Sequence, residues 1–217
     1  MFIALLSQQP ILALIWLIVI LMSLTIHEFS HAVVGMKLGD RTAEAMGRMT
    51  LNPLAHIDWM GFIPLLLLGF GWAKPVPFNP YNLKDPKWDS VKIALAGPAS
   101  NLLMAIVAAL VFRGVVAAGL VGPGNALASF LVLLVIINLY LMFFNIIPVH
   151  PLDGSKLLDA LLVKPEHQRL RQSIAHYGPR ILLILVLLSI MTSFNIFFFI
   201  SIPSEMLCDV LIGGRCF

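Results

Sequence analysis

The chain has 217 residues, of which 59% are hydrophobic and 12% are charged, and its formal net charge is +3. Soluble domains carry about 25% charged and about 45–50% apolar residues, so this composition excludes an ordinary soluble protein and indicates an integral membrane protein in a lipid bilayer. Apolar segments use most of the chain, so we expect residues 1–217 to form a single polytopic membrane domain without a nucleic-acid partner. The first apolar segment lacks a basic flank and an A-x-A site, so we do not expect it to be a cleavable signal peptide.

The first predicted transmembrane helix covers residues 10–39 and contains the most informative motif of the chain. Within it, His27, Glu28 and His31 form the pattern His-Glu-x-x-His. On a helix the two histidines lie one turn apart on the same face, so both imidazoles can bind one metal ion, and Glu28 beside them is the candidate general base. Ionisable groups inside a bilayer are costly and mark function by default. The alternative is that these groups pair with one another in a packed bundle.

Residues 59–78 contain an apolar stretch that is too short to cross a bilayer. Its apolar part, 59–73, holds Pro64 and three glycines within 15 residues, whereas a spanning helix needs about 20. We therefore predict a re-entrant or β-hairpin segment here. Extended chain over 69–78 would offer an edge that pairs with a substrate peptide, and a hairpin that only seals the helix bundle is the equal alternative.

Two further transmembrane helices are predicted over residues 91–112 and 126–147. The first begins with the small-residue stretch Gly97–Asn101, which allows another helix to approach closely. We expect Asn101 to form a hydrogen bond across that interface, with a role facing the site as the alternative.

The third predicted helix breaks at Pro148 and Pro151, and the break places Asp153 at a defined point. Two prolines at this spacing end a regular helix, so the freed backbone is expected to line a polar cavity. A catalytic zinc ion typically has three protein ligands and leaves a fourth position for water. His27, His31 and Asp153 complete such a set for one Zn²⁺ per chain.

The fourth predicted transmembrane helix covers residues 179–200, and the basic residues orient the resulting four crossings. Loops 36–92 and 150–180 hold twelve of the fourteen Lys and Arg residues, and both loops follow odd-numbered crossings. The positive-inside rule makes their side cytoplasmic. The second histidine of the motif lies ~12 Å from the end of the first helix on that side. We therefore expect a multi-pass protein of the inner (plasma) membrane whose active site opens toward the cytoplasm.

The short tail after the fourth helix holds both cysteines of the chain, Cys208 and Cys216. With four crossings the tail lies on the external face, where an oxidising environment preserves disulfides. Gly213-Gly214 lies between the cysteines and lets their Cα atoms approach the separation of about 5.5–6 Å that a disulfide favours. We expect a disulfide here, and two unpaired thiols beside the membrane are the alternative.

The motifs together resemble those of the site-2 protease family of intramembrane zinc metalloproteases. The resemblance covers about residues 10–165 and fits the compact prokaryotic branch without PDZ or CBS domains. His150 and Trp59 stand where proline is common in that family, and we interpret His150 as a neighbour of the site rather than a ligand. The resemblance rests on His27–His31, on Asn145-x-x-Pro148-x-x-Pro151-Leu152-Asp153-Gly154, and on likeness in residues 51–58, 71–77 and 97–101.

The resemblance implies a zinc-dependent metalloendopeptidase that hydrolyses a peptide bond in or near a transmembrane helix of a membrane protein substrate, in regulated proteolysis. It implies His27, His31 and Asp153 as zinc ligands, Glu28 as the general base, and Asn145 as a polar residue that positions substrate or stabilises the reacting carbonyl. The alternatives are a divalent-metal transporter that uses the same ligands as a transit site and an inactive relative that binds client helices without cutting them. Neither the substrate, nor the oligomeric state, nor a role for His56 follows from the sequence.

Overall fold

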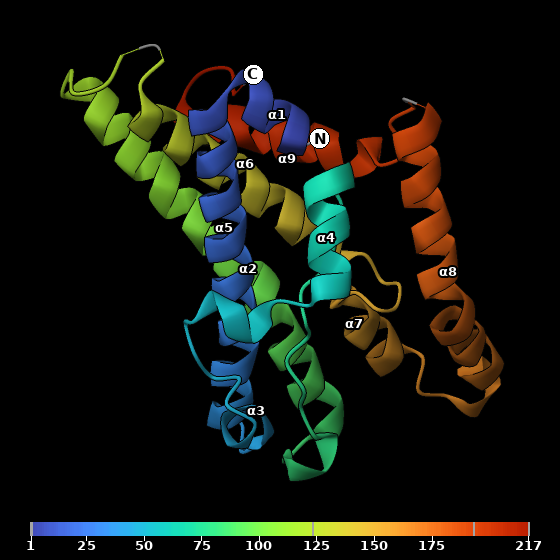
Figure 1. The fold of residues 1–217 in the computed structure, drawn as a ribbon. Helices are drawn as coiled ribbons and strands as arrows, with labels where there is room; N and C mark the ends of the chain where they lie inside the picture. The colour runs from blue at the N-terminus through green and yellow to red at the C-terminus, as the bar shows by residue number, and fades with distance from the viewer. Residues whose placement is uncertain (1, 123, 193, 217) are drawn as a thin grey trace.

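The computed structural model describes residues 2–122, 124–192 and 194–216, and within them every regular element is helical (Figure 1). Among the described residues, four helical segments are long and apolar enough to cross a membrane: α2, α5, α6 and α8 with the turn before it. This confirms the predicted all-α membrane architecture. The helices are α1 (Phe2–Gln8), α2 (Pro10–Lys37), α3 (Thr42–Ala45), α4 (Trp59–Leu68), α5 (Pro86–Ala117), α6 (Ala126–Ile146), α7 (Gly154–Leu161), α8 (Gln168–Thr192) and α9 (Phe198–Ile212), with the 3-10 turns η1 (Pro53–His56), η2 (Pro80–Asn82) and η3 (Pro165–His167).

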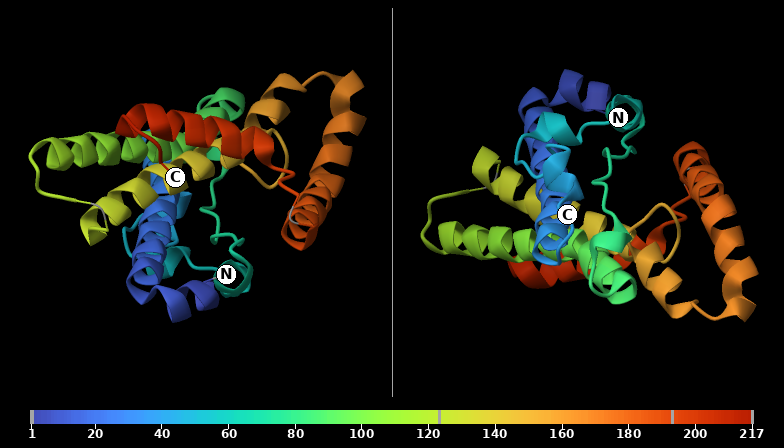
Figure 2. Two further views of the ribbon diagram at one scale, coloured as in Figure 1. Left: turned by 90° about the horizontal axis from the view of Figure 1, so that it is seen from above. Right: turned by 90° about the horizontal axis from the view of Figure 1, so that it is seen from below.

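Helices α2, α5 and α6 form the central trio of the molecule, and each packs against the other two. Fully buried alanines on α5, among them Ala105 and Ala109, belong to the same apolar core as Val135 and Leu139 of α6. Small side chains of this kind let membrane helices approach closely and gain packing contacts. Viewed from above and below, α8 stands to one side of the trio (Figure 2).

Helix α5 is longer than the predicted segment 91–112 at both ends. The carboxylate of Asp85 caps its start by accepting hydrogen bonds from the backbone N–H groups of Lys87 and Trp88. The first turn is charged, so the apolar pattern alone could not reveal it. Helix α6 agrees with the predicted segment 126–147 to within one residue.

The predicted fourth helix, 179–200, is corrected by the structure. Helix α8 begins earlier, at Gln168, and ends at Thr192, so Pro179 lies inside it rather than at its first position. The polar residues ahead of Pro179 are helical although they lack the apolar pattern of a membrane span. Residue 193 of the predicted segment lies outside the described residues. The expected tail is largely a further helix, α9, which starts at Phe198.

Residues 59–78 form helix α4 followed by extended chain, and the described part of this stretch contains no β-hairpin. Gly69 ends α4 in the left-handed conformation, with φ of 80°. The extended residues 70–79, which we call the strap, then return along α4. A Cβ on Gly61 would lie 2.2 Å from the carbonyl oxygen of Trp72, and one on Gly71 would lie 2.1 Å from that of Gly61. The two glycines thus permit this close packing, and re-entry into the bilayer stays a prediction.

The two ends of the helix bundle differ in what they carry. The N-terminus, α1 and α9 lie at one end, and α3 lies at the other (Figure 1). Cys208 and Cys216 form the predicted disulfide, with a Cα–Cα separation of 6.0 Å. Because Cys208 belongs to α9, the disulfide lies at the end of the molecule opposite the basic loop that follows α2.

Candidate metal centre

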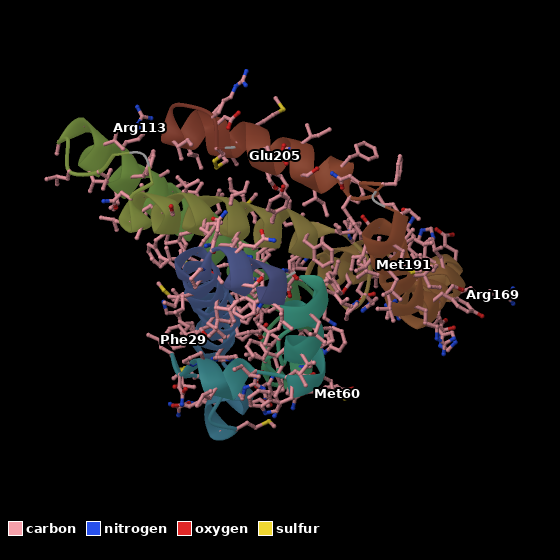
Figure 3. All side chains as sticks on the ribbon, turned by 45° about the horizontal axis from the view of Figure 1, so that its top comes forward. Phe29, Met60, Arg113, Arg169, Met191 and Glu205 are labelled. Carbon is pink, nitrogen blue, oxygen red and sulfur yellow. A yellow bond between two sulfur atoms is a disulfide. The ribbon has the colours of Figure 1, made fainter. Side chains whose placement is uncertain are left out.

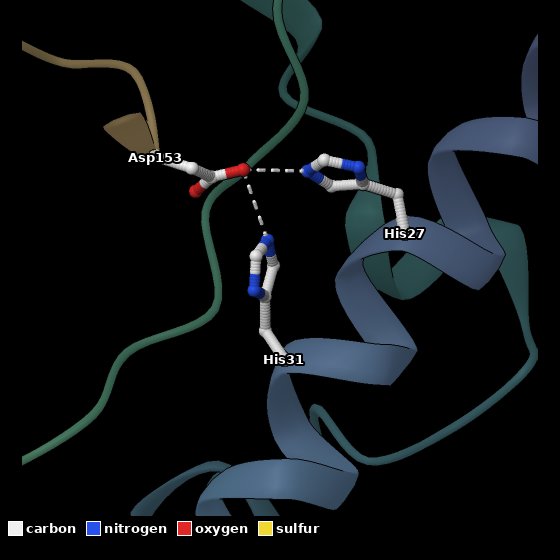
Figure 4. Close-up of side chains that lie close together, drawn as sticks. All are labelled: His27, His31 and Asp153. Carbon is white, nitrogen blue, oxygen red and sulfur yellow. Dashed lines mark ion pairs between the residues drawn. The ribbon is translucent and has the colours of Figure 1, made fainter. Parts of the chain in front are cut away.

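Two buried histidines of α2 and a partly buried aspartate at the start of α7 meet in one cluster (Figure 4). The Oδ2 atom of Asp153 lies 3.1 Å from Nε2 of His27 and 3.4 Å from Nε2 of His31. The cluster forms because α2 is a regular helix through the motif, which stacks the two imidazoles on one face. The chain break after α6 brings Asp153 back to that face. The structure therefore brings together the three predicted ligands from distant parts of the sequence.

The second nitrogen of each imidazole is held by an oxygen acceptor. The Nδ1 atom of His27 lies 2.5 Å from Oδ1 of Asn101, and that of His31 lies 2.7 Å from the carbonyl oxygen of Ile93. A carbonyl oxygen accepts and cannot donate, so each Nδ1 carries the proton and each Nε2 presents a lone pair to the cluster. Acceptors of this kind fix the tautomer and ring orientation of metal-binding histidines.

The donor set fits a zinc ion. Zinc bonds to imidazole nitrogen and carboxylate oxygen measure about 2.0–2.2 Å, so neighbouring ligands of a tetrahedral site lie about 3.3–3.6 Å apart, close to the observed separations. The buried Oδ2 atom of Asp153 has no hydrogen-bond partner among the described residues. Two imidazole lone pairs and a carboxylate oxygen facing one another repel unless a cation lies between them, so the arrangement favours a bound metal ion.

Gly97 of α5 leaves the space that the two imidazoles occupy. A Cβ at this position would lie 2.5 Å from Nε2 of His31 and 2.6 Å from Nε2 of His27. The small-residue stretch was expected to serve helix packing, and its first residue also lies directly against the site. Asn101, four residues later, combines both roles that the sequence left open, because it crosses the helix interface and contacts His27.

Glu28 lies beside the cluster and contacts the strap. Its side chain is 8% exposed, and its Oε2 atom accepts a hydrogen bond of 2.9 Å from the backbone N–H of Val76. The buried Arg48 holds the adjoining part of the strap by donating to the carbonyl oxygens of Lys74 and Pro75, at 2.6 and 3.2 Å. The strap therefore lies over the candidate base, and part of its backbone is already paired.

The remaining candidate residues lie outside the cluster of ligands. The side-chain amide of Asn145 donates to the carbonyl oxygen of Leu141 in its own helix, at 3.0 Å. His150 pairs with Asp159 at 3.3 Å, in keeping with its interpretation as a neighbour. The buried His56 bonds the carbonyl oxygen of Thr50, and its own carbonyl oxygen accepts the N–H of Lys74, so it supports the strap. The metal cluster identified in the described part of the chain does not include these three residues.

Sequence reasoning missed three buried polar residues around the site: Arg48, Ser23 and Asn138. Arg48 gave no local signal because its partners lie about 26 residues further along the chain. Asn138 did carry a signal, since it is a polar side chain within the uncharged helix α6 and lies seven residues before Asn145.

Comparisons with known proteins agree with this site. The sequence model of peptidase family M50 matches residues 15–122 and 115–189, which contain the three clustered residues and Glu28. YwhC of Bacillus subtilis, named as a candidate zinc metalloprotease, is 37% identical over 83% of this chain and 81% of its own length. Rip2 of Mycolicibacterium smegmatis is 31% identical over 82% of this chain and 68% of its own length. MJ0611 of Methanocaldococcus jannaschii is 32% identical over 61% of this chain and 62% of its own length. Both are also named as candidate zinc metalloproteases. No solved structure matches. The match along most of the sequence, joined to the cluster of His27, His31 and Asp153 in a chain with helices long enough to span a membrane, shows that the chain belongs to peptidase family M50.

Proposed function

We propose that the chain is a zinc-dependent intramembrane endopeptidase that hydrolyses a peptide bond in or near a transmembrane helix of a membrane protein, in regulated proteolysis. One observation supports this above all: two imidazole nitrogens and a carboxylate oxygen converge beside Glu28, on a helix long enough to cross a membrane. A transport site would need the ligands, but it would give no role to a buried carboxylate next to them.

His27 and His31 would hold the metal through Nε2, and Asp153 through Oδ2. When bound, zinc supplies Lewis-acid polarisation of the scissile carbonyl and lowers the pKa of a coordinated water to about 7. Asn101 and the Ile93 carbonyl keep the two imidazoles in the tautomer that binding needs.

Glu28 would serve as the general base, accepting a proton from the attacking water and passing it to the leaving amine. Its low exposure keeps bulk water from competing for that proton, and the N–H of Val76 fixes the direction of its carboxylate. Asn145 would position the substrate or the reacting carbonyl. To do so its amide must leave the bond to Leu141.

The strap would hold the substrate in extended form. A transmembrane helix satisfies its own carbonyl groups, so a segment to be cut must first be unwound, and its freed backbone groups then need partners. The strap is extended and adjoins Glu28, which makes it the candidate partner. Contacts from Arg48 and His56 would keep it in place while substrate binds.

The site would open toward the cytoplasm of a cell with an inner (plasma) membrane. His31 lies six residues before the end of α2, about 9 Å along the helix, at the end that bears the basic loop. The positive-inside rule assigns that end to the cytoplasm.

Two substitutions in the purified protein test the proposal. His31→Ala should reduce bound zinc from about one ion per chain to almost none, because it removes one of three ligands. Glu28→Gln should keep zinc but lower cleavage of a model transmembrane substrate by about 10²–10⁴-fold, since the amide cannot act as a base. Near-normal cleavage by Glu28→Gln would contradict the role of Glu28 as the base. Equal zinc content in wild type and His31→Ala would contradict the assignment of the ligands. Zinc flux into proteoliposomes without cleavage would support a transporter instead.

A further inference from the structure

A buried series of hydrogen bonds leads from His27 to the third spanning helix. Oδ1 of Asn101 lies 2.5 Å from Nδ1 of His27, and Nδ2 of Asn101 donates to Oδ1 of Asn138 at 2.7 Å. Nδ2 of Asn138 in turn donates to the carbonyl oxygen of Leu134 at 2.7 Å and to Oγ of Ser23 at 2.9 Å. Ser23, Asn101 and Asn138 are fully buried. The series therefore joins α2, α5 and α6 where water does not reach.

The direction of every bond in this series follows from the Leu134 carbonyl. That oxygen can only accept, so Asn138 must turn its NH₂ group toward it and its Oδ1 toward Asn101. Asn101 must then donate with Nδ2, which leaves its own Oδ1 facing His27. His27 consequently keeps its proton on Nδ1 and its lone pair on Nε2.

The other histidine of the site needs no such arrangement. His31 contacts the backbone carbonyl of Ile93, which always presents an oxygen. A side-chain amide can present either oxygen or NH₂ to a neighbour, because the two ends have nearly the same shape. If Asn101 turned over, its NH₂ would meet the N–H of His27, and the imidazole would have to move its proton to the nitrogen that faces the metal.

We propose that Asn138 is a positioning residue of the metal centre, which acts through Asn101 to hold His27 in its zinc-binding tautomer. The proposal rests on the zinc site described above and adds a residue that touches none of the three ligands. It also explains why two asparagines are buried between apolar helices. An amide buried without a hydrogen-bond partner is destabilising, so each of the two asparagines needs the partners that this network gives it.

The test measures zinc affinity by competition with a chromogenic chelator in detergent. Asn138→Leu should weaken zinc binding about 10-fold and Asn101→Leu about 10–100-fold, the range for groups that orient metal ligands. Ser204→Ala is the matched control: Ser204 is fully buried on α9, and its hydroxyl has no hydrogen-bond partner in the described part of the chain. The control should bind zinc as wild type does, and circular dichroism should show that all variants remain folded.

A double variant separates the proposed role from a general packing role. When ionised, the carboxylate of Asn101→Asp has only acceptor oxygens, so it faces His27 with an oxygen whichever way it turns. Adding Asn101→Asp to Asn138→Leu should therefore restore zinc affinity to within a few-fold of wild type. If Asn138 only fills space, the double variant will bind zinc no better than Asn138→Leu.

The ¹⁵N shifts of the two ring nitrogens of His27 in the metal-free protein give an independent result. Wild type should show the proton on Nδ1, and Asn138→Leu should show a mixture of both tautomers. The same tautomer in both proteins, or unchanged zinc affinity in Asn138→Leu, overturns the proposal. If wild type binds no zinc but its His27 tautomer still differs from that of Asn138→Leu, the proposed enzyme is overturned and the positioning of His27 by Asn138 stands.

Discussion

Gly97→Ala adds a single methyl group at the point where α5 meets the metal centre. The new Cβ would lie 2.5 Å from Nε2 of His31 and 2.6 Å from both Cε1 and Nε2 of His27, whereas ordinary contacts begin at 3.4 Å. The two rings or α5 must therefore move by roughly 1 Å, and metal–ligand distances tolerate deviations of only about 0.2 Å. Because the methyl group lies on the nitrogens that face the metal, we expect zinc affinity to fall by about 100-fold or more, beyond the 10–100-fold effect of outer contacts.

Gly114→Ala, in the same helix, is the matched control. A Cβ on Gly114 meets no atom within 4 Å among the described residues. Alanine favours an exposed helix by about 0.5–1 kcal/mol over glycine, so this variant should keep zinc and lose no thermal stability. Chelator competition and thermal unfolding in detergent compare the two proteins. Gly97→Ala with wild-type zinc affinity would refute the close approach of α5 to the imidazoles.

Three further expectations concern the strap, the loop after α2 and the disulfide between Cys208 and Cys216. Val76→Pro removes the N–H that donates to Glu28, so it should leave zinc bound but weaken both cleavage of substrate and crosslinking to it. Val76→Ala keeps that N–H and should preserve both. Unchanged cleavage and crosslinking in Val76→Pro would mean that the strap only seals the bundle. Burial acts to raise the pKa of Asp40, but hydrogen bonds from Thr42, Asn82 and Asn79 outweigh it and lower that pKa below its usual value. The ionised carboxylate therefore stabilises the fold above pH about 4, and this contribution is lost as the pH falls through the depressed folded pKa. Asp40→Asn should lower Tm at neutral pH, with the difference from wild type narrowing below pH about 4, and a pH-independent difference would contradict this. A membrane-impermeant maleimide should label Cys208 and Cys216 from outside only after reduction; labelling without reduction would exclude the disulfide, and labelling only after the cytoplasmic face is opened would overturn the orientation.

Two features of the candidate metal centre could be predicted from local rules, although the approach of Asp153 to the histidines joins distant parts of the chain. The four-residue spacing of His27 and His31 fixes their common face on any helix, and two prolines mark the break that delivers Asp153. The number of candidate membrane-spanning helices in the described part of the chain followed in the same way from the length of the apolar segments. These features depend on neighbours in the sequence, so the sequence alone indicates them.

The features that could not be predicted depend on contacts between distant segments. The polar first turns of α8 gave no membrane signal, and their helical form became visible only in the structure. The strap is extended through contacts with Arg48 and Glu28 rather than through strand pairing. The pairing of Asn101 with Asn138 joins two helices whose register the sequence does not contain.

Quantitative proteomics of membrane-protein fragments tests whether the protein cuts membrane proteins inside cells with Glu28 as its base. The experiment compares strains that carry wild type or Glu28→Gln at equal protein levels. With wild type, we expect fragments whose new ends lie in or near a transmembrane segment, and with Glu28→Gln we expect the same proteins to remain uncut. Zinc content of the two purified proteins should be the same, because Glu28 lies outside the cluster of ligands. Identical sets of fragments in the two strains would contradict an endopeptidase that uses Glu28 as its base.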